Sequence, residues 1–426
     1  MINHLKKTGK QWLTGLLLLS FHLAAAQDQL LNIDSCYAMA KRNFPLVQQY
    51  ALIERSTEYS IENARKGYLP QINLAGQASY QSAVTQIPIS LPNMDIPSLS
   101  KDQYKLYAEV VQPVTDLFTV KDQKDLVQAN TAIEVQKIEV ELYKLKERIN
   151  QLFFGILLID AQLTQTDLLK KDIQSGIDKT NVAITNGVAI RSIADNLRAE
   201  LLKADQKIIE LKAARKGYLD MLALFTGQTI ADHTVLEKPA QQIVSNTINR
   251  PELKLYELQK STFDIQQKLI TAKNRPRFSV FLQGGLGRPA LNMLSNDVND
   301  YYIGGVRLNW NLSGFYTYNR EKQLLSVNQQ SLDVQRETFL FNTNLSMLQQ
   351  NAEISKIQQL IATDNDIIRL RENIKNTTQT QLTNGMATTN DYLIAVNAED
   401  QARQNQLLHE VQLLMAQYNY LATTGN

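Results

Sequence analysis

Apolar residues recur through the first half of the chain with the period of a coiled coil. Between Leu117 and about Asn186 there is no proline, and the apolar positions advance in alternating steps of four and three residues. These positions are Ile138, Leu142, Leu145, Ile149, Leu152, Ile156, Ile159 and Leu163. A mean step of about 3.5 residues is the coiled-coil repeat. The pattern therefore predicts a helix of about 70 residues, roughly 105 Å long.

A second helix of similar length is predicted between Gly314 and about Asn384. One apolar stripe keeps the same rhythm at Val334, Thr338, Phe341, Leu345, Leu348 and Ala352, and a second stripe continues at Ile354, Ile361 and Ile368. A lone helix of this length frays, because most helical stability comes from packing an apolar face. Each long helix therefore needs a partner, and the segments 189–225 and 388–421 are the candidates.

Two Asn-Gly pairs separate the long helices from these partners. Asn186-Gly187 and Asn384-Gly385 are typical of helix ends, because both residue types tolerate a positive φ. After the turns, Ser192-x-x-Asp195 and Thr388-x-x-Asp391 both fit a capping box. Each half of the chain is thus predicted to contain an antiparallel helical hairpin.

A different period follows two prolines that end helices, Pro70 and Pro276. Apolar residues there alternate with polar ones, first at Ile72, Leu74, Ala78 and Tyr80, then at Tyr104, Leu106, Ala108 and Val110, at Phe278, Val280 and Leu282, and at Tyr302, Val306, Leu308 and Trp310. Membrane β-strands have this alternation over ~9–11 residues, and aromatic ends suit a membrane interface. An antiparallel sheet that covers a soluble core remains an alternative.

The order of elements occurs twice. Asn43-Phe44-Pro45 and Asn249-Arg250-Pro251 each open a helical stretch that leads to a strand pair and a long hairpin. We therefore expect a first repeat at 27–248 and a second at 249–426. Two repeats are too few for a solenoid, but copies of the chain could assemble as a ring. Four strands cannot close a barrel in lipid, whereas the twelve strands of three chains can.

The N-terminus predicts export. Lys6, Lys7 and Lys10 precede a short apolar run, and three alanines end at Ala26. Residues 1–26 are therefore predicted to be a signal peptide, with an uncleaved anchor as the alternative. No other uninterrupted apolar run approaches the ~20 residues of a spanning helix. Cys36 is the only cysteine, which excludes an intrachain disulfide, and we expect it to be a buried thiol.

Composition argues against several functions. The 44 basic and 42 acidic residues nearly balance, so no nucleic-acid partner is predicted. Of four histidines, two fall in the predicted signal peptide and the others stand alone, which argues against a histidine metal site. The run Gly284-Gly285-Leu286-Gly287 lacks the lysine and helix of a phosphate loop. Residues 296–300 read as a solvated turn, with a cation site as the weaker alternative. No nucleophile lies beside a base, so we predict no enzyme activity and no cofactor.

The duplicated order, the transition Tyr68-Leu69-Pro70-Gln71-Ile72 and the paired Asn-Gly turns resemble the outer-membrane efflux protein family of TolC-like channels. The resemblance covers residues 28 to 424 approximately. It implies a mainly α protein with a membrane β-barrel: a homotrimer with a twelve-stranded barrel on a long α-helical tunnel. It also implies a location in the outer membrane, with the tunnel extending into the periplasm.

The resemblance further implies a function and partners. Such a protein is the exit channel of a tripartite efflux or type I secretion system, and it works with a periplasmic adaptor and an inner-membrane transporter. The alternatives are a periplasmic adaptor or a structural coiled-coil protein. An adaptor has one hairpin rather than two, and a coiled-coil protein does not need two strand pairs. The transported substrate is not predicted.

The same resemblance implies site residues at the helical turns. Asp391 matches an acidic residue of the channel entrance, Asp195 is its counterpart in the first half, and Arg191 could bridge helical rows. Asn186, Gly187, Asn384 and Gly385 would contact the adaptor. The chain departs from the family pattern at Ile394, where a second acidic residue is expected, and at Ala387, where a basic residue is common. A helix cap is the alternative role of Asp391.

Overall fold

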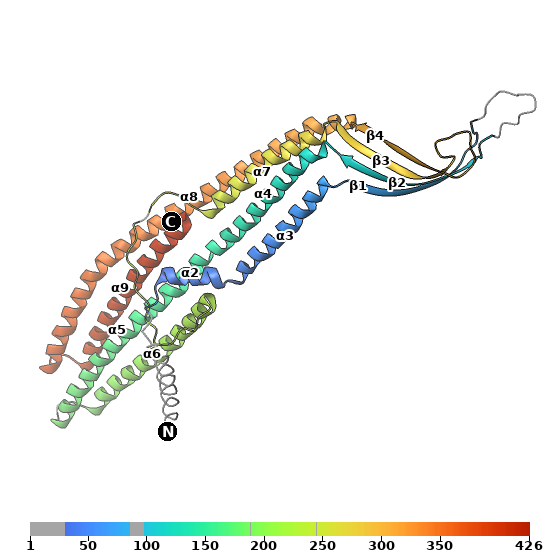
Figure 1. Cartoon of the computed structure of the whole chain (residues 1–426). Coiled ribbons are helices and arrows are strands. Elements are labelled where there is room, and N and C mark those ends of the chain that lie inside the picture. Colours follow the sequence, from blue (N-terminus) through green and yellow to red (C-terminus); the bar gives the residue numbers. More distant parts are fainter. Residues whose placement is uncertain (1–29, 86–97, 188, 244) are drawn as a thin grey trace, which may run out of the picture. The chain divides into compact units, whose positions relative to one another are not determined.

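The computed structural model describes residues 30–85, 98–187, 189–243 and 245–426, so the predicted signal peptide and the prolines at 88, 92 and 97 lie outside the described residues. These segments form long helices and one four-stranded sheet (Figure 1). They divide into two compact units, each built from both predicted repeats. Unit 1 comprises the described residues up to Pro45, Leu142–Ile248 and Asn344–Asn426, and unit 2 comprises Leu46–Glu141 and Asn249–Thr343.

Unit 2 contains four helical rows. They are α3 (Gln48–Arg65), α4 (Asp116–Tyr143), α7 (Pro251–Lys273) and the first part of α8 (Phe315–Thr383). Side-chain hydrogen bonds join neighbouring rows: Tyr50 to Glu139, Gln136 to the carbonyl of Pro251, and Lys260 to Asp333. The rows therefore lie in the order α3, α4, α7 and α8.

The sheet of unit 2 is antiparallel and open. Its strands β1 (Gln71–Tyr80), β2 (Asp102–Pro113), β3 (Arg277–Arg288) and β4 (Asn299–Asn309) pair in chain order. One row of partners runs Leu74, Ala108, Gly284 and Tyr302 across the whole sheet. The prediction of four strands of about ten residues is confirmed, and β1 and β4 are left as the two edges.

The two faces of the sheet differ as the alternation predicted. Residues directly opposite in an antiparallel ladder share a face, so the register places Leu74, Leu282 and Leu308 on one side. That face is uncovered: Leu74 is 77% exposed and Leu282 is 56% exposed. A sheet that covers a soluble core would bury these side chains, so that alternative is wrong for the described chain.

The opposite face is polar and crowded. Arg307 pairs with Glu109 at 2.7 Å and lies 4.4 Å from the ring centroid of Phe281. Gly285 sits in β3, where a Cβ would collide with Tyr107 and its backbone. The glycine run is therefore part of a strand that needs a close approach, and it does not precede a helix.

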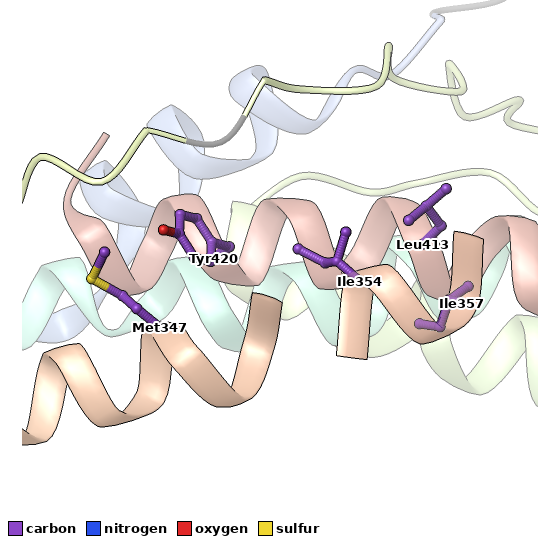
Figure 2. Packing of buried hydrophobic residues seen from close by; sticks show 5 residues of the cluster. All are labelled: Met347, Ile354, Ile357, Leu413 and Tyr420. Atoms are coloured by element: carbon purple, nitrogen blue, oxygen red, sulfur yellow. The ribbon is translucent and has the colours of Figure 1, made fainter. Parts of the chain in front are cut away.

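Unit 1 is a helical assembly with α5 (Leu145–Thr185) at its centre. This helix packs against α6 (Arg191–Thr226) on one side and α9 (Thr389–Thr424) on the other, while α2 (Ile33–Asn43) contacts α5 and α6. The second part of α8 packs on α9. Figure 2 shows this contact, with Met347, Ile354 and Ile357 of α8 facing Leu413 and Tyr420 of α9.

A second core cluster in unit 1 lies towards the Asn-Gly turns. Ile173 and Ile177 of α5 pack with Leu197 of α6 and Leu393 of α9. Between them, Gly176 faces Leu197 and Tyr392, and a Cβ at this glycine would stand 3.4 Å from the tyrosine ring. A Cβ at Gly176 would make only ordinary van der Waals contacts, so the spacing of the three helices does not depend on a glycine there.

The long helices agree with the sequence in the second repeat and differ in the first. Helix α8 runs for 69 residues without a break, as predicted. The first long helix is divided at Lys144 into α4, with 28 residues, and α5, with 41 residues. The backbone of Lys144 keeps φ −62° and ψ −17°, so the interruption is one residue wide.

The α4–α5 stretch is rich in apolar residues, although polar residues interrupt its apolar runs as the sequence indicated. By length and composition alone, the helical region Asp116–Thr185 could cross a membrane. Ile149, Phe153, Phe154 and Ile156 of this region are fully buried in unit 1, whereas Phe118 is 76% exposed. The chain's own core therefore accounts for part of the apolar composition of this region, since 39% of its most apolar stretch is buried.

A strap of irregular backbone follows α6, and its described residues are 227–243 and 245–250. Leu236 in the strap forms a parallel bridge with Leu31, and Arg215 of α6 donates to the carbonyl of Thr234 while pairing with Asp160. Nearby, Cys36 of α2 is fully buried, which raises the pKa of its thiol to about 12. The expectation of a buried thiol is confirmed.

Candidate functional site at the helical turns

Both Asn-Gly pairs end a helix in the manner the sequence predicted. Gly187 and Gly385 have φ of +75° and +71°, and their N–H groups donate to the carbonyls of Ile184 and Leu382. No atom lies within 4 Å of a Cβ built at either glycine. The left-handed backbone, rather than lack of space, therefore favours glycine at these two turns.

Asp391 forms a complete capping box with Thr388 at the start of α9. The N–H of Asp391 donates to Thr388 Oγ1 at 3.2 Å, and both the N–H and the hydroxyl of Thr388 donate to Asp391 Oδ2, at 2.9 and 2.6 Å. The hydroxyl bond is the main cause that holds the pKa of Asp391 below its usual value. This exposed carboxylate is therefore ionised as well as fixed in position.

The matching prediction for the first hairpin is wrong. Helix α6 begins at Arg191, and its cap residue is Ile190, whose side chain cannot accept a hydrogen bond. Ser192 therefore lies inside the helix, and Asp195 instead pairs with Arg198 at 2.9 Å on an exposed face. A cap depends on where the backbone leaves the extended region, and here that happens two residues before the serine.

The predicted entrance residues all lie in unit 1, close to the helical turns, but the structure does not bring them into contact. Within the described residues, no hydrogen bond or ion pair joins Arg191 or Asp195 to Asp391, and Arg191 has no carboxylate partner. Two apolar side chains are exposed nearby: Met386 at 72% and Ile394 at 60%. The end of the molecule that carries the Asn-Gly turns thus presents the fixed charge of Asp391 and the exposed apolar side chains of Met386 and Ile394.

A charged network behind the turns, centred on the buried Glu399, was not foreseen from the sequence. Lys375 of α8 pairs with Glu399 of α9 at 2.6 Å and with Asp172 of α5 at 3.0 Å. Arg403 adds a contact of 2.7 Å to Glu399. The spacing of Glu399 and Arg403 is a visible i,i+4 pair, but Lys375 and Asp172 lie 203 residues apart. The network connects three helices just behind the candidate entrance.

The network is charged despite its burial. Burial alone would lower the pKa of Lys375, but its hydrogen bonds to Glu399 and Asp172 raise it above the usual value. Burial alone would raise the pKa of Glu399, but the bonds to Lys375 and Arg403 lower it. The structure therefore holds a lysine and a glutamate in their ionised forms between helices.

Metal binding receives no support from the described residues. No group of three His, Cys, Asp or Glu side chains among them could hold a metal ion. His409 is engaged by Asp364 at 2.6 Å between α9 and α8. The chemistry available at the tip is thus that of fixed charges, helix ends and apolar surface.

No protein-family model matches the sequence, and no curated protein is similar enough to count as a match. Solved structures do match. The chain is similar to the outer membrane protein VceC of Vibrio cholerae, with 11% identity, a TM-score of 0.64, and coverage of 92% of this chain and 96% of that chain. It is similar to the MtrE outer membrane channel of Neisseria gonorrhoeae in its open state, with 13% identity, a TM-score of 0.63, and coverage of 92% and 89%.

The CmeC outer membrane channel of Campylobacter jejuni gives a third match, with 11% identity, a TM-score of 0.60, and coverage of 92% of this chain and 85% of that chain. The chain has the fold of these outer-membrane channels. The resemblance to TolC-like channels that the sequence indicated is therefore confirmed at the level of the fold. At such low identity, the fold is what the matches establish.

Proposed function

We propose that the protein is an outer-membrane exit channel, formed by three copies, of a tripartite efflux or type I secretion system. The observation that carries the proposal is the two-faced sheet. Its apolar face is uncovered, while its opposite face holds the Glu109–Arg307 ion pair and polar side chains such as Gln77 and Gln283. Lipid on one side and a wet lumen on the other is the environment that suits such a sheet.

The open edges of the sheet support a trimer. An unpaired strand edge is not tolerated in the hydrocarbon region, because its N–H and C=O groups find no water there. With β1 and β4 as edges, β1 of one copy would pair with β4 of the next. Three copies would then close a twelve-stranded barrel without a free edge.

Uncovered stripes on the helices support the same assembly. Val334, Phe341, Leu345 and Leu348 of α8 are all more than half exposed, as are Leu202, Ile209 and Leu224 of α6. Apolar side chains at helical spacing that their own chain does not bury are typical of an interface between helices. We assign these stripes to contacts between copies, which would complete an α-helical tunnel.

The tip of the tunnel would face the rest of the machinery. Asn186, Gly187, Asn384 and Gly385 would contact a periplasmic adaptor that joins the channel to an inner-membrane transporter. Asp391 would line the entrance as a ring of three, with Asp195 and Arg191 adjusting its charge. The uncovered Ile394 would add an apolar ring where the family pattern has a second acidic residue.

The alternatives explain less of the molecule. A periplasmic adaptor has a single hairpin, whereas this chain has two hairpins and two strand pairs. A structural coiled-coil protein would leave the uncovered apolar face of the sheet without a purpose. It would also remain soluble without detergent, which gives a simple preliminary test.

The decisive experiment combines mass with conductance. Purified protein in detergent, corrected for the bound micelle, should have the mass of three chains. The same sample should open channels in a planar bilayer. A stable detergent-solubilised monomer with intact strands would contradict the barrel, and a trimer without conductance would contradict the channel.

A further inference from the structure

Aromatic and basic side chains converge at the end of the sheet where the long helices begin. Trp310 follows β4 directly, two residues after Leu308, so it continues the apolar face. Its indole N–H donates to the carbonyl of Asn274 at 3.2 Å, which fixes the ring. The Phe315 ring packs edge-on at 6.2 Å from Trp310, and Tyr318 packs in the same way at 6.2 Å from Phe315. The three rings form a ladder that descends from the apolar face onto α8.

Two cations stand at the foot of this ladder. The Nζ of Lys322 lies 4.5 Å from the ring centroid of Tyr318. The hydrogen bond to Lys322 is the main cause that lowers the pKa of the Tyr318 phenol, and the positive charge of Arg275 acts in the same direction. Arg275 is exposed and Lys322 is half-buried. Lys322 thus lies against Tyr318, and Arg275 directly follows Asn274, whose carbonyl binds Trp310, so both positive charges belong to the end of the sheet that carries the ladder.

Neither cation is neutralised by the surrounding protein. The nearest acidic residue in sequence, Glu321, accepts from Thr317 at 2.8 Å and pairs with Lys273 at 3.4 Å. In the part of the chain that the structure describes, no carboxylate lies within ion-pairing distance of Arg275 or Lys322. The cluster therefore has positive charge available for an anion from outside the chain.

The rings determine what kind of anion fits. Trp310 and Phe315 are each about half exposed, and Tyr316 beside them is 85% exposed. An amphipathic ligand could lay apolar chains on the rings and the apolar sheet face while its anionic group reaches the cations. A small soluble anion would use the cations and leave the rings unused.

We propose that Trp310, Phe315, Tyr318, Lys322 and Arg275 form a binding site for the headgroup of an anionic phospholipid. The proposal rests on the proposed function, because it needs the sheet to lie in a bilayer. Aromatic rings favour the interface between hydrocarbon and water, and each basic residue near an anionic surface favours such lipids about fivefold. Arg and Lys both form charge-assisted hydrogen bonds to phosphate oxygens. The site would hold the channel at a fixed depth in the leaflet on the side of the tunnel.

Trp310 itself can report the lipid beside it. The sequence has two tryptophans, and the other, Trp12, lies in the predicted signal peptide. Protein without that segment can be reconstituted in phosphatidylcholine vesicles that contain a minor fraction of phosphatidylglycerol. In one sample the phosphatidylglycerol chains carry bromine, and in the other an equal fraction of the phosphatidylcholine does. Bromine quenches indole fluorescence on contact, so stronger quenching by the brominated phosphatidylglycerol would report its enrichment.

Substitution of the two cations tests the site. In Arg275→Gln/Lys322→Gln the preference for phosphatidylglycerol should fall by about twenty-fivefold, which is about fivefold for each of the two charges lost. The matched control is Lys268→Gln/Arg320→Gln, which removes one exposed positive charge from α7, the helix that ends two residues before Arg275, and one from α8, the helix that carries Lys322. The control should keep the preference. An equal loss in both variants would reduce the effect to general surface charge and overturn the site.

The quenching distinguishes the proposed lipid site from the proposed location of the sheet in a membrane. Quenching by both brominated lipids to the same extent in the unaltered protein would place Trp310 in the bilayer but overturn the lipid site. No quenching by either lipid would overturn both the site and the membrane sheet. Unchanged quenching of the cation variant by brominated phosphatidylcholine would show that it folds and inserts. Glycerol phosphate added in solution should not abolish the preference, and if it did, the site would bind soluble phosphate instead.

Discussion

Two long apolar stripes with the same spacing have opposite surroundings in this chain. In the α4–α5 stretch the stripe is buried: Ile138, Leu145 and Ile156 are at most 5% exposed. In α8 the corresponding stripe is open to solvent, with Val334 at 60% and Phe341 at 69%. A heptad period therefore predicts that a helix has a partner, and it does not say whether the partner belongs to the same chain.

The difference follows from position. Helix α5 lies between α6 and α9 in unit 1, so its own chain covers it from two sides. Helix α8 buries Met347, Ile354 and Ile357 against α9 and keeps its other stripe free. The chain thus covers one apolar surface by itself and leaves another exposed, which the proposed assembly of copies would cover.

The largest effect is expected where the chain buries its own stripe. Phe154 is fully buried, with its ring 5.3 Å from that of Tyr418. Phe154→Ala should lower the free energy of unfolding by about 3–5 kcal/mol, because a cavity remains in the core. Thermal or denaturant unfolding of detergent-solubilised protein measures the change.

The matched control is Phe341→Ala on the exposed stripe. It should leave the unfolding of a dissociated chain nearly unchanged and weaken the trimer instead, which dilution followed by mass photometry would detect. If both variants destabilised the dissociated chain equally, the two stripes would have the same role and the contrast would be lost.

A similar contrast separates the two faces of the sheet. Leu282→Arg places a charge on the apolar face, where it should cost about 2–4 kcal/mol near the middle of a membrane. Gln283→Arg, one residue later, points to the polar face and should be tolerated. The fraction of protein that inserts into vesicles during refolding measures both. Equal insertion of the two variants would show that the apolar face does not meet lipid.

The same comparison can be made between a buried and an exposed ion pair, by the stability that is lost when the lysine of each pair is removed. Lys375→Met removes the lysine from Glu399, whose side chain is only 5% exposed, and should cost about 1.5–3 kcal/mol. The control Lys238→Met breaks a bridge to Glu410 in which the lysine side chain is 59% exposed, and should cost less than about 1 kcal/mol.

The cost of Lys375→Met should depend on pH in a defined direction. The folded protein lowers the pKa of Glu399, so the pair stabilises the fold above the carboxyl's unfolded pKa of about 4.3. This stability is lost as the pH falls through the lower, folded pKa. The difference between variant and unaltered protein should therefore shrink in strong acid. A difference that is constant from neutral to acid pH would exclude the ion pair as its source.

The smallest change in stability, with a large change in function, is expected at Asp391. Asp391→Asn keeps an acceptor for the capping box, so the helix should lose little. If three copies form a negative ring at the entrance, the variant should lose cation selectivity. The reversal potential in a salt gradient measures this, with the exposed Asp366→Asn on α8 as control.

The low pKa of Asp391 sharpens this prediction. Because the Thr388 hydroxyl bond favours the ionised carboxylate, selectivity should persist as the pH falls through the ordinary range of an aspartate. It should be lost only under more acidic conditions. An unchanged reversal potential in the variant would leave Asp391 with the role of a helix cap alone.

Much of the fold could be predicted from the sequence because its signals are local and periodic. The alternation around Leu74 and Leu282, the Asn-Gly turns and the length of α8 all depend on nearest neighbours along the chain. The interruption at Lys144 has no such signal, since its backbone stays helical. The sequence predicts the cap of α6 two residues too late, at Ser192, because serine is a common cap residue. In the structure Ile190 has the extended backbone of the cap position.

The candidate site could be predicted only in part. The capping box at Asp391 is encoded within four residues, and the structure contains it. The pairing of Lys375 with Asp172 joins residues from different repeats, which one sequence without relatives cannot reveal. The roles of Asp195 and Arg191 at an entrance stay predictions, because a constriction on a symmetry axis depends on neighbouring copies.

The order of strands has a consequence for how the protein is made. Strands β2 and β3 pair with each other although they are far apart in the sequence. The N–H of Phe278 in β3 donates to the Thr115 hydroxyl just after β2, and these two residues are 163 positions apart. Closing so long a loop costs only slightly more free energy than closing a shorter one, but such non-local pairing is slow. During synthesis the β1–β2 hairpin emerges first and must keep an apolar face and a free edge until the second repeat follows. Exposed edges of this kind invite aggregation, so this stage of biogenesis is the one at which a holding chaperone would be most needed.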